Sequence, residues 1–105
     1  MASAVDASQG KEPHRIVVKL AIQAYAPERG IGSWNESDAM LRVEMWSTPE
    51  QTAVISGNPA GLTSLARHLL TLAQNGVPDG NHFDFDTYSG WLAEDSIALR
   101  IEVER

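Results

Sequence analysis

The chain has 105 residues, the size of one domain, and its apolar fraction of 43% suffices for one core. No stretch approaches the roughly 20 apolar residues that a membrane span needs, so we expect no membrane association. The sequence has no cysteine, which excludes disulfides and thiolate zinc sites.

The formal net charge of −6 is unevenly distributed. Residues 79–105 hold seven acids and two bases, whereas residues 1–78 hold seven acids and six bases. An acidic C-terminal part repels a phosphate backbone, so we expect no nucleic-acid binding. It suits a basic protein partner, and it also keeps the chain soluble.

The first 14 residues, "MASAVDASQGKEPH", contain few large apolar side chains and lack the apolar core of a secretory signal. We therefore predict a disordered tail over residues 1–14 and a single domain over residues 15–105. The expected location is the cytoplasm.

Two alternating runs follow the tail. Residues 15–26 predict a long strand with Ile16, Val18, Leu20, Ile22 and Ala24 on one face. Residues 39–47 predict a second strand, whose inward residues are Leu41, Val43 and Met45. The polar loop between them predicts a long hairpin, and residues 52–56 predict a short third strand.

Residues 57–76, "GNPAGLTSLARHLLTLAQNG", give the strongest local signal. Asn58 is a good N-cap, Pro59 suits the first helical position, and Gly76 can end the helix. These signals predict a helix over residues 59–75. We expect one apolar stripe to face the core: Leu62, Leu65, Ala66, Leu69, Leu72 and Ala73. His68 lies off this stripe, and we expect it to face water.

The remaining chain predicts a strand at "HFDFD" (82–86), a loop or single helical turn over residues 87–95, and a last strand over residues 96–104. The order is strand, strand, strand, helix, strand, strand. It predicts a two-layer α+β fold, in which one antiparallel sheet of about five strands has the helix packed on one face.

The HFDFD strand separates into two faces, with Phe83 and Phe85 on one and His82, Asp84 and Asp86 on the other. Side chains two residues apart on a strand lie about 7 Å from each other, so two of the polar groups can reach one metal ion. A zinc or iron site needs further ligands. We predict no metal and no cofactor, and a core of phenyl rings below an exposed polar face. A metal-dependent enzyme stays as an alternative.

Nucleophilic catalysis has weak support in the sequence. Ser64 and His68 are four residues apart on the predicted helix, but a serine in mid-helix lacks the strained, exposed geometry of a nucleophile. We therefore expect no enzymatic activity.

The second half of the chain, about residues 54–103, resembles the immunity protein family numbered thirty-two of bacterial polymorphic toxin systems. The positions that carry this resemblance are Gly57, Asn58, Gly61, Leu62, Leu65, Ala66, Leu69, Leu72, Ala73, His82, Asp86, Leu92, Ser96, Leu99 and Ile101. The family often has a second His two residues after the first, where this chain has Asp84. The resemblance implies a non-catalytic α+β protein that binds and neutralises a cognate toxin.

Under this interpretation the acidic C-terminal part would contact the toxin, which would be basic, as a nuclease is. The candidate contact residues are His82, Asp84, Asp86, Trp91, Glu94 and Asp95. For Trp91 the other interpretation is structural, because Trp91 and Leu92 can plug the end of the core. The alternative function is a stand-alone interaction domain of unknown partner, including a homodimer joined through an edge strand or the second sheet face.

Overall fold

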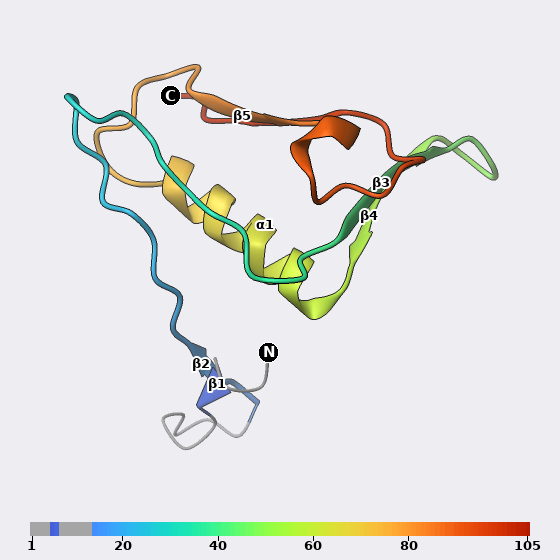
Figure 1. Ribbon diagram of the computed structural model, residues 1–105, viewed down its shortest axis with the longest axis horizontal. Helices are drawn as coiled ribbons and strands as arrows, with labels where there is room; N and C mark the ends of the chain where they lie inside the picture. Colours follow the sequence, from blue (N-terminus) through green and yellow to red (C-terminus); the bar gives the residue numbers. More distant parts are fainter. Residues whose placement is uncertain (1–4, 7–13) are drawn as a thin grey trace.

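The computed structural model describes residues 5–6 and 14–105. Its elements, in chain order, are β1 (Val5–Asp6), β2 (Val17–Val18), β3 (Leu41–Trp46), β4 (Thr52–Gly57), α1 (Pro59–Leu72), β5 (His82–Phe85), the 3₁₀-helix η3 (Thr87–Ser89) and β6 (Leu99–Glu102). The predicted α+β class is confirmed. Figure 1 shows α1 beneath the β5–β6 hairpin, with the β3–β4 hairpin at one end. Most of the predicted tail, residues 1–4 and 7–13, lies outside the described residues.

In the described part of the chain, the strands form three two-stranded antiparallel sheets: β1–β2, β3–β4 and β5–β6. The predicted single sheet is therefore wrong, and so is the hairpin between residues 15–26 and 39–47, because β3 pairs with β4. The other edge of β3 bonds to an irregular segment. The Leu41 N–H donates to the Trp91 carbonyl (2.9 Å), and the Ala93 N–H donates to the Leu41 carbonyl (2.8 Å). This irregular segment, residues 91–93, therefore occupies the edge of β3 at which a further strand could have paired.

The first predicted strand is present only as β2, because the chain after it is bound by side chains of α1 rather than by a partner strand. The Arg67 Nε–H donates to the Ala21 carbonyl at 3.0 Å. The side chain of Gln74, just past the helix, donates to the Gln23 carbonyl at 3.0 Å and accepts from the Tyr25 N–H at 2.9 Å. These bonds satisfy backbone groups that a sheet would otherwise pair.

The start of helix α1 and its N-cap residue are those that the sequence predicts. Asn58 is the N-cap, its Oδ1 accepts from the Gly61 N–H at 2.7 Å, and Pro59 is the first helical residue. The helix ends at Leu72, before the predicted residue 75, and Gly76 adopts a left-handed φ of +88°.

The orientation of α1 differs from the prediction. Leu62 and Leu69, at the centre of the apolar stripe, are 44% and 46% exposed. The buried residues of α1 are Gly61, Ser64, Arg67, His68, Thr71 and Leu72. The prediction that His68 faces water is therefore wrong. The prediction that the stripe faces the core holds for Leu72, which is buried, and for Leu65, which packs against the core cluster, but is wrong for Leu62 and Leu69. The buried polar side chains bind backbone and side-chain groups of the chain that crosses the helix, which makes their burial tolerable.

The main core cluster is small. It comprises Leu41, Val43, Trp91 and Leu92, with Ala39, Leu65, Phe85 and Leu99 packed against it. Leu41 and Val43 are buried as predicted, but Met45 at the end of β3 is 50% exposed. In the part of the chain that the structure describes, no helix combines the length and the apolar sequence that crossing a membrane requires.

Candidate functional site

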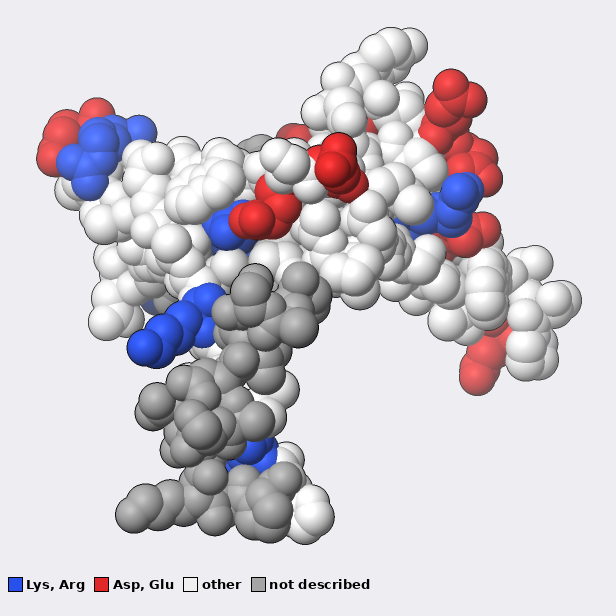
Figure 2. All heavy atoms as spheres, turned by 60° about the horizontal axis from the view of Figure 1, so that its bottom comes forward, with Lys and Arg blue, Asp and Glu red and all other residues white. Residues whose placement is uncertain are grey.

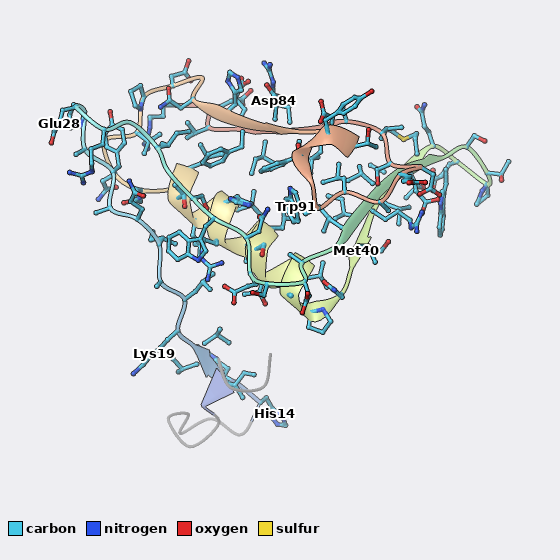
Figure 3. The ribbon with its side chains drawn as sticks, viewed as in Figure 1. His14, Lys19, Glu28, Met40, Asp84 and Trp91 are labelled. Carbon is cyan, nitrogen blue, oxygen red and sulfur yellow. The ribbon has the colours of Figure 1, made fainter. Side chains whose placement is uncertain are left out.

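The β5–β6 hairpin has one aromatic and one polar face. Phe83 lies opposite Ile101 and Phe85 opposite Leu99, and both phenyl rings are half-buried. The exposed face carries His82, Asp84, Arg100 and Glu102. Figure 3 shows Asp84 on the outer side of the hairpin, away from α1. The prediction that Phe83 and Phe85 lie on the inner face of the strand is confirmed, as is the exposure of His82, Asp84 and Asp86.

Asp84 is bound by a neighbouring arginine. Arg100 donates to both carboxylate oxygens, from Nε at 2.7 Å and from Nη2 at 3.1 Å. This bond lowers the pKa of the Asp84 carboxyl below its ordinary value. The His82 Nε2 lies 3.5 Å from the same carboxylate, and its Nδ1 lies 2.9 Å from the Gly80 carbonyl. The outer face of the hairpin therefore carries two carboxylates, Asp84 and Glu102, against the single guanidinium of Arg100, which pairs with both.

Asp86, the third polar residue of the HFDFD run, binds the backbone of η3. Its Oδ1 accepts from the Tyr88 N–H at 2.9 Å, and the Asp86 N–H donates to the Ser89 Oγ at 2.9 Å, which completes a capping box. Among the residues that the structure describes, no three His, Asp or Glu side chains are grouped to hold a metal ion.

The short helix η3 presents Tyr88 to solvent. The Tyr88 side chain is 95% exposed, on a turn fixed by Asp86 and Ser89 and ended by Gly90 at a left-handed φ of +92°. A tyrosine on a rigid turn loses little conformational entropy on binding and offers both an apolar ring and a hydroxyl. Tyr88 is also more exposed than any other large hydrophobic side chain in the described part of the chain.

Beneath this surface lies an aromatic layer that includes His68. The ring of His68 lies 4.9 Å from Phe85, 5.4 Å from Phe83 and 5.4 Å from Trp91 between centroids. Trp91 is only 5% exposed, and Figure 3 shows it pointing toward α1. The structural interpretation of Trp91, as a plug of the core, is the one observed. The layer packs β5 against α1 and Trp91.

His68 is held in its neutral form. Burial, with a smaller contribution from the charge of Arg67, lowers the pKa of His68 from 6.5 to about 4. Its Nε2 lies 2.7 Å from the Asn35 Oδ1, so Nε2 carries the proton and donates it to this bond. The Nδ1 is buried without a hydrogen-bond partner among the described groups.

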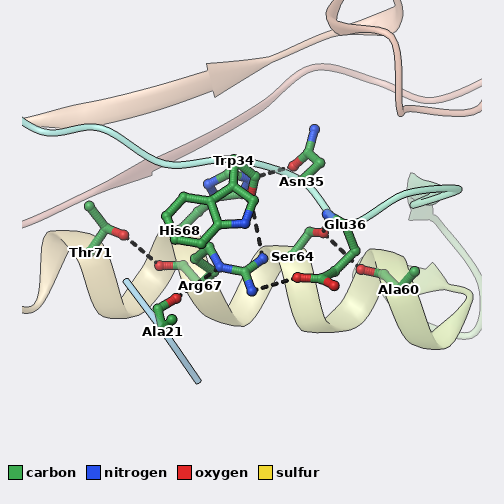
Figure 4. A network of polar contacts seen from close by, with 9 residues as sticks. All are labelled: Ala21, Trp34, Asn35, Glu36, Ala60, Ser64, Arg67, His68 and Thr71. Carbon is green, nitrogen blue, oxygen red and sulfur yellow. Dashed lines mark hydrogen bonds and ion pairs between the residues drawn. The ribbon is translucent and has the colours of Figure 1, made fainter. Parts of the chain in front are cut away.

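Asn35 belongs to the segment that crosses α1, residues 21–36, which we call the crossing segment. Other side chains of α1 also bind it (Figure 4). Arg67 pairs with Glu36 at 2.5 Å, and its guanidinium lies 4.4 Å from the ring centre of Trp34. The Ser64 Oγ accepts from the Glu36 N–H at 2.8 Å and donates to the Ala60 carbonyl at 2.8 Å. Residues 34–36 are thus fixed to the polar side of α1, beside the aromatic layer.

The remaining predicted contact residues lie in the segment between η3 and β6. Asp95 pairs with Arg42 of β3, and Glu94 is exposed. The structure brings His82 and Asp84 together on the hairpin, places Asp86 at the start of η3, and buries Trp91. On the face drawn in Figure 2, acidic side chains lie in separate groups with wide uncharged areas between them.

Sequence reasoning missed Tyr88. The usable signal was the spacing of Asp86, Ser89 and Gly90, which encodes a capped turn and its end. A residue inside such a turn, between an aromatic strand and a buried tryptophan, has its backbone fixed and its side chain turned outward.

The comparisons with known proteins assign a family. No curated protein and no solved structure matches the chain. The family described as Immunity protein 32 matches residues 52–104, just over half of the chain and the whole span from β4 to β6. The chain therefore belongs to the Immunity protein 32 family.

Proposed function

We propose that this chain is a non-catalytic immunity protein, which binds a cognate bacterial toxin in the cytoplasm of the producing cell and blocks it. The family match over residues 52–104 carries this proposal, because it includes every element around Tyr88. Blocking by occlusion needs a rigid complementary surface, and the polar and aromatic contacts beneath β5 and η3 supply such rigidity.

The proposed contact surface centres on Tyr88, with acidic residues around it along the C-terminal part of the chain. The residues in this proposal are His82, Asp84, Asp86, Tyr88, Glu94 and Asp95. Trp91 contributes from below, since a side chain 5% exposed has little area to offer a partner. Tyrosine is enriched among the residues that dominate binding energy, and acidic groups around it speed the approach of a basic toxin.

Growth rescue tests this function. The gene directly upstream would be expressed under tight induction in a bacterial host, with and without this chain. We expect the upstream product to stop growth and this chain to restore it. A harmless upstream product, or killing that persists, would contradict the proposal.

The Tyr88 surface is tested in the same assay and by affinity measurement. We expect Tyr88→Ala to weaken toxin binding by about tenfold or more, as for a residue central to an interface. Trp46→Ala is the matched control, because Trp46 is an exposed aromatic (52%) on β3, outside the proposed surface. Equal effects of the two substitutions would remove Tyr88 from the interface.

A stand-alone interaction domain is the second candidate function. It is favoured by apolar side chains exposed outside the Tyr88 surface, among them Met45, Trp46 and Ile55 of the β3–β4 hairpin. A harmless upstream gene together with self-association of the purified chain would favour this candidate.

A further inference from the structure

Strand β4 is an open sheet edge. It pairs with β3 along all six of its residues, and residues 91–93 occupy the opposite edge of β3. In the part of the chain that the structure describes, no strand pairs with the outer edge of β4, and four of its six residues are exposed. Its sequence, TAVISG, has no charge and no proline, and its unbroken register has no bulge. These are the features that usually block such an edge, so β4 can accept a further strand.

The same chain carries a strand-forming segment without a full partner. We call residues 14–20 the arm. Its residues Ile16, Val17 and Val18 are β-branched, which favours a strand, and they are 44–54% exposed. Among the described residues, its strand pairing is limited to the two residues of β2, which bond to β1 along one edge. Figure 1 shows β2 well apart from β4 of the same chain.

One face of the arm is apolar, and so is one face of the β3–β4 hairpin. Alternation places Ile16 and Val18 on the same face of the arm. In the β3–β4 register Val43 lies opposite Ile55, on the face that also carries Met45. Met45 and Ile55 are 50% and 42% exposed. A strand laid along β4 with Ile16 and Val18 on this side covers Ile55 and extends the apolar face of the hairpin.

The same alignment brings opposite charges to the other face. There Lys19 of the arm, labelled in Figure 3, shares a face with Glu44, which lies opposite Val54 of β4. Lys19 and Glu44 take no part in the ion pairs formed within the described residues. Residues 14–20 hold two bases and no acid, whereas residues 21–105 hold five bases and twelve acids. The arm of one copy is therefore attracted to the rest of another.

We propose that the arm of one copy adds as a strand to the open edge of β4 in a second copy, and that two copies exchange arms to form a two-fold dimer. Each copy has one arm and one open β4 edge, so reciprocal exchange uses both and closes the assembly. The chain after the arm is fixed to α1 where Arg67 binds the Ala21 carbonyl, and from there the arm runs away from its own β4. This direction favours a second copy over the same chain as the acceptor.

Sedimentation equilibrium of the full chain over a range of concentrations tests the proposal, and we expect a monomer–dimer equilibrium. Val18→Asp in the arm and Ile55→Lys in β4 should each weaken dimerisation by about tenfold or more, because each places a charge in the new strand pair. Leu70→Lys is the matched control, since Leu70 is 48% exposed but lies on α1, and it should stay within about twofold. Near-ultraviolet circular dichroism confirms that each variant is folded.

Mixing the two variants identifies the exchange of arms. The Val18→Asp copy keeps an intact β4 edge and the Ile55→Lys copy keeps an intact arm, so the mixture should associate more strongly than either variant alone. Lys19→Glu should also weaken the dimer. Adding Glu44→Lys to that chain should restore part of the affinity, because the charges are then reversed rather than opposed by like charges.

Three results would overturn the proposal. The first is a full chain that is still monomeric at about 1 mM. The second is a dimer that Ile55→Lys dissociates and Val18→Asp leaves unchanged, which would indicate direct pairing of two β4 strands. The third is a mixture of the two variants that associates no better than each alone. All of these measurements are made without the toxin, so growth rescue tests the immunity function separately.

Discussion

His68 is a titratable side chain whose charge is set by its burial. It is 4% exposed, it packs among three aromatic rings, and its one hydrogen-bond partner, the Asn35 Oδ1, is a neutral acceptor that supplies no negative charge to stabilise a protonated imidazole. The lowered pKa, about 4, couples the stability of the aromatic layer to pH.

We predict that acidification from about pH 6.5 to about pH 4 costs about 3 kcal/mol of folding free energy through His68. In this window the unfolded chain takes up a proton at His68 that the folded chain does not, so stability falls as pH falls. Urea denaturation at both pH values measures it. His68→Gln should lose much of this dependence, and His82→Gln, at an exposed histidine, should keep it. Equal pH dependence in all three proteins would contradict the assignment.

Gly61 is required by a close backbone approach. A Cβ at this position would lie 2.0 Å from the Met40 carbonyl oxygen and 2.7 Å from its carbon. Gly61→Ala gains helix propensity, about 1 kcal/mol at most, but forces α1 away from the chain before β3. We predict a net loss of about 1–3 kcal/mol in unfolding free energy. Thermal denaturation checks it, with an alanine substitution at an exposed position of the same helix, Leu70→Ala, as the control that is expected to be nearly neutral.

At the scale of elements, α1 uses two sides for two purposes. Its polar side binds the segment of residues 21–36, and the opposite side leaves Leu62 and Leu69 of the apolar stripe almost half exposed. Burying a polar side requires that nearly every group find a partner, and Arg67 alone contacts Ala21, Trp34 and Glu36. Among the residues that the structure describes, no strand pairs with the crossing segment, so its position depends on these side chains.

We predict that Arg67→Ala frees the crossing segment. Hydrogen exchange at residues 20–36 should speed up by at least about tenfold, with a loss of about 2 kcal/mol or more in stability. Arg67→Lys keeps the charge but cannot serve the same three partners, so it should give an intermediate effect. Unchanged exchange over residues 20–36 in Arg67→Ala would show that other contacts hold the segment.

At the scale of the whole molecule, the described chain is extended. Its radius of gyration is 15.6 Å, against about 13 Å for a compact domain of this length. Figure 1 shows the reason, because β1 and β2 lie apart from α1 and the other strands. Ile16, Val17 and Val18 are accordingly 44–54% exposed.

We predict that deletion of residues 1–18 leaves the rest of the fold intact. The free energy of unfolding should change by less than about 1 kcal/mol, because β2 buries little surface against the other described elements. Near-ultraviolet circular dichroism and urea denaturation measure this. A larger loss would show that the N-terminal residues support the domain. The growth-rescue assay with the shortened chain would show whether these residues also take part in binding the toxin.

The sequence alone determined the local elements that have their own chemistry. Asn58 and Pro59 begin the helix, Gly76 follows its end, and alternation places Phe83 and Phe85 opposite His82 and Asp84. The family resemblance also came from the sequence, on the part of the chain that the family match later covered. These features depend on neighbours within a few residues, so the sequence records them directly.

The tertiary structure decided what each face contacts. Hydropathy assigned Leu62 and Leu69 to the core and His68 to water, but hydrogen bonds to residues 21–36 turned the polar side of α1 inward. The same bonds replaced the first predicted strand pairing, and the turn at η3 exposed Tyr88 while Trp91 was buried. Periodicity reports which residues share a face. Which face is buried depends on partners distant in the chain, and no local pattern contains them.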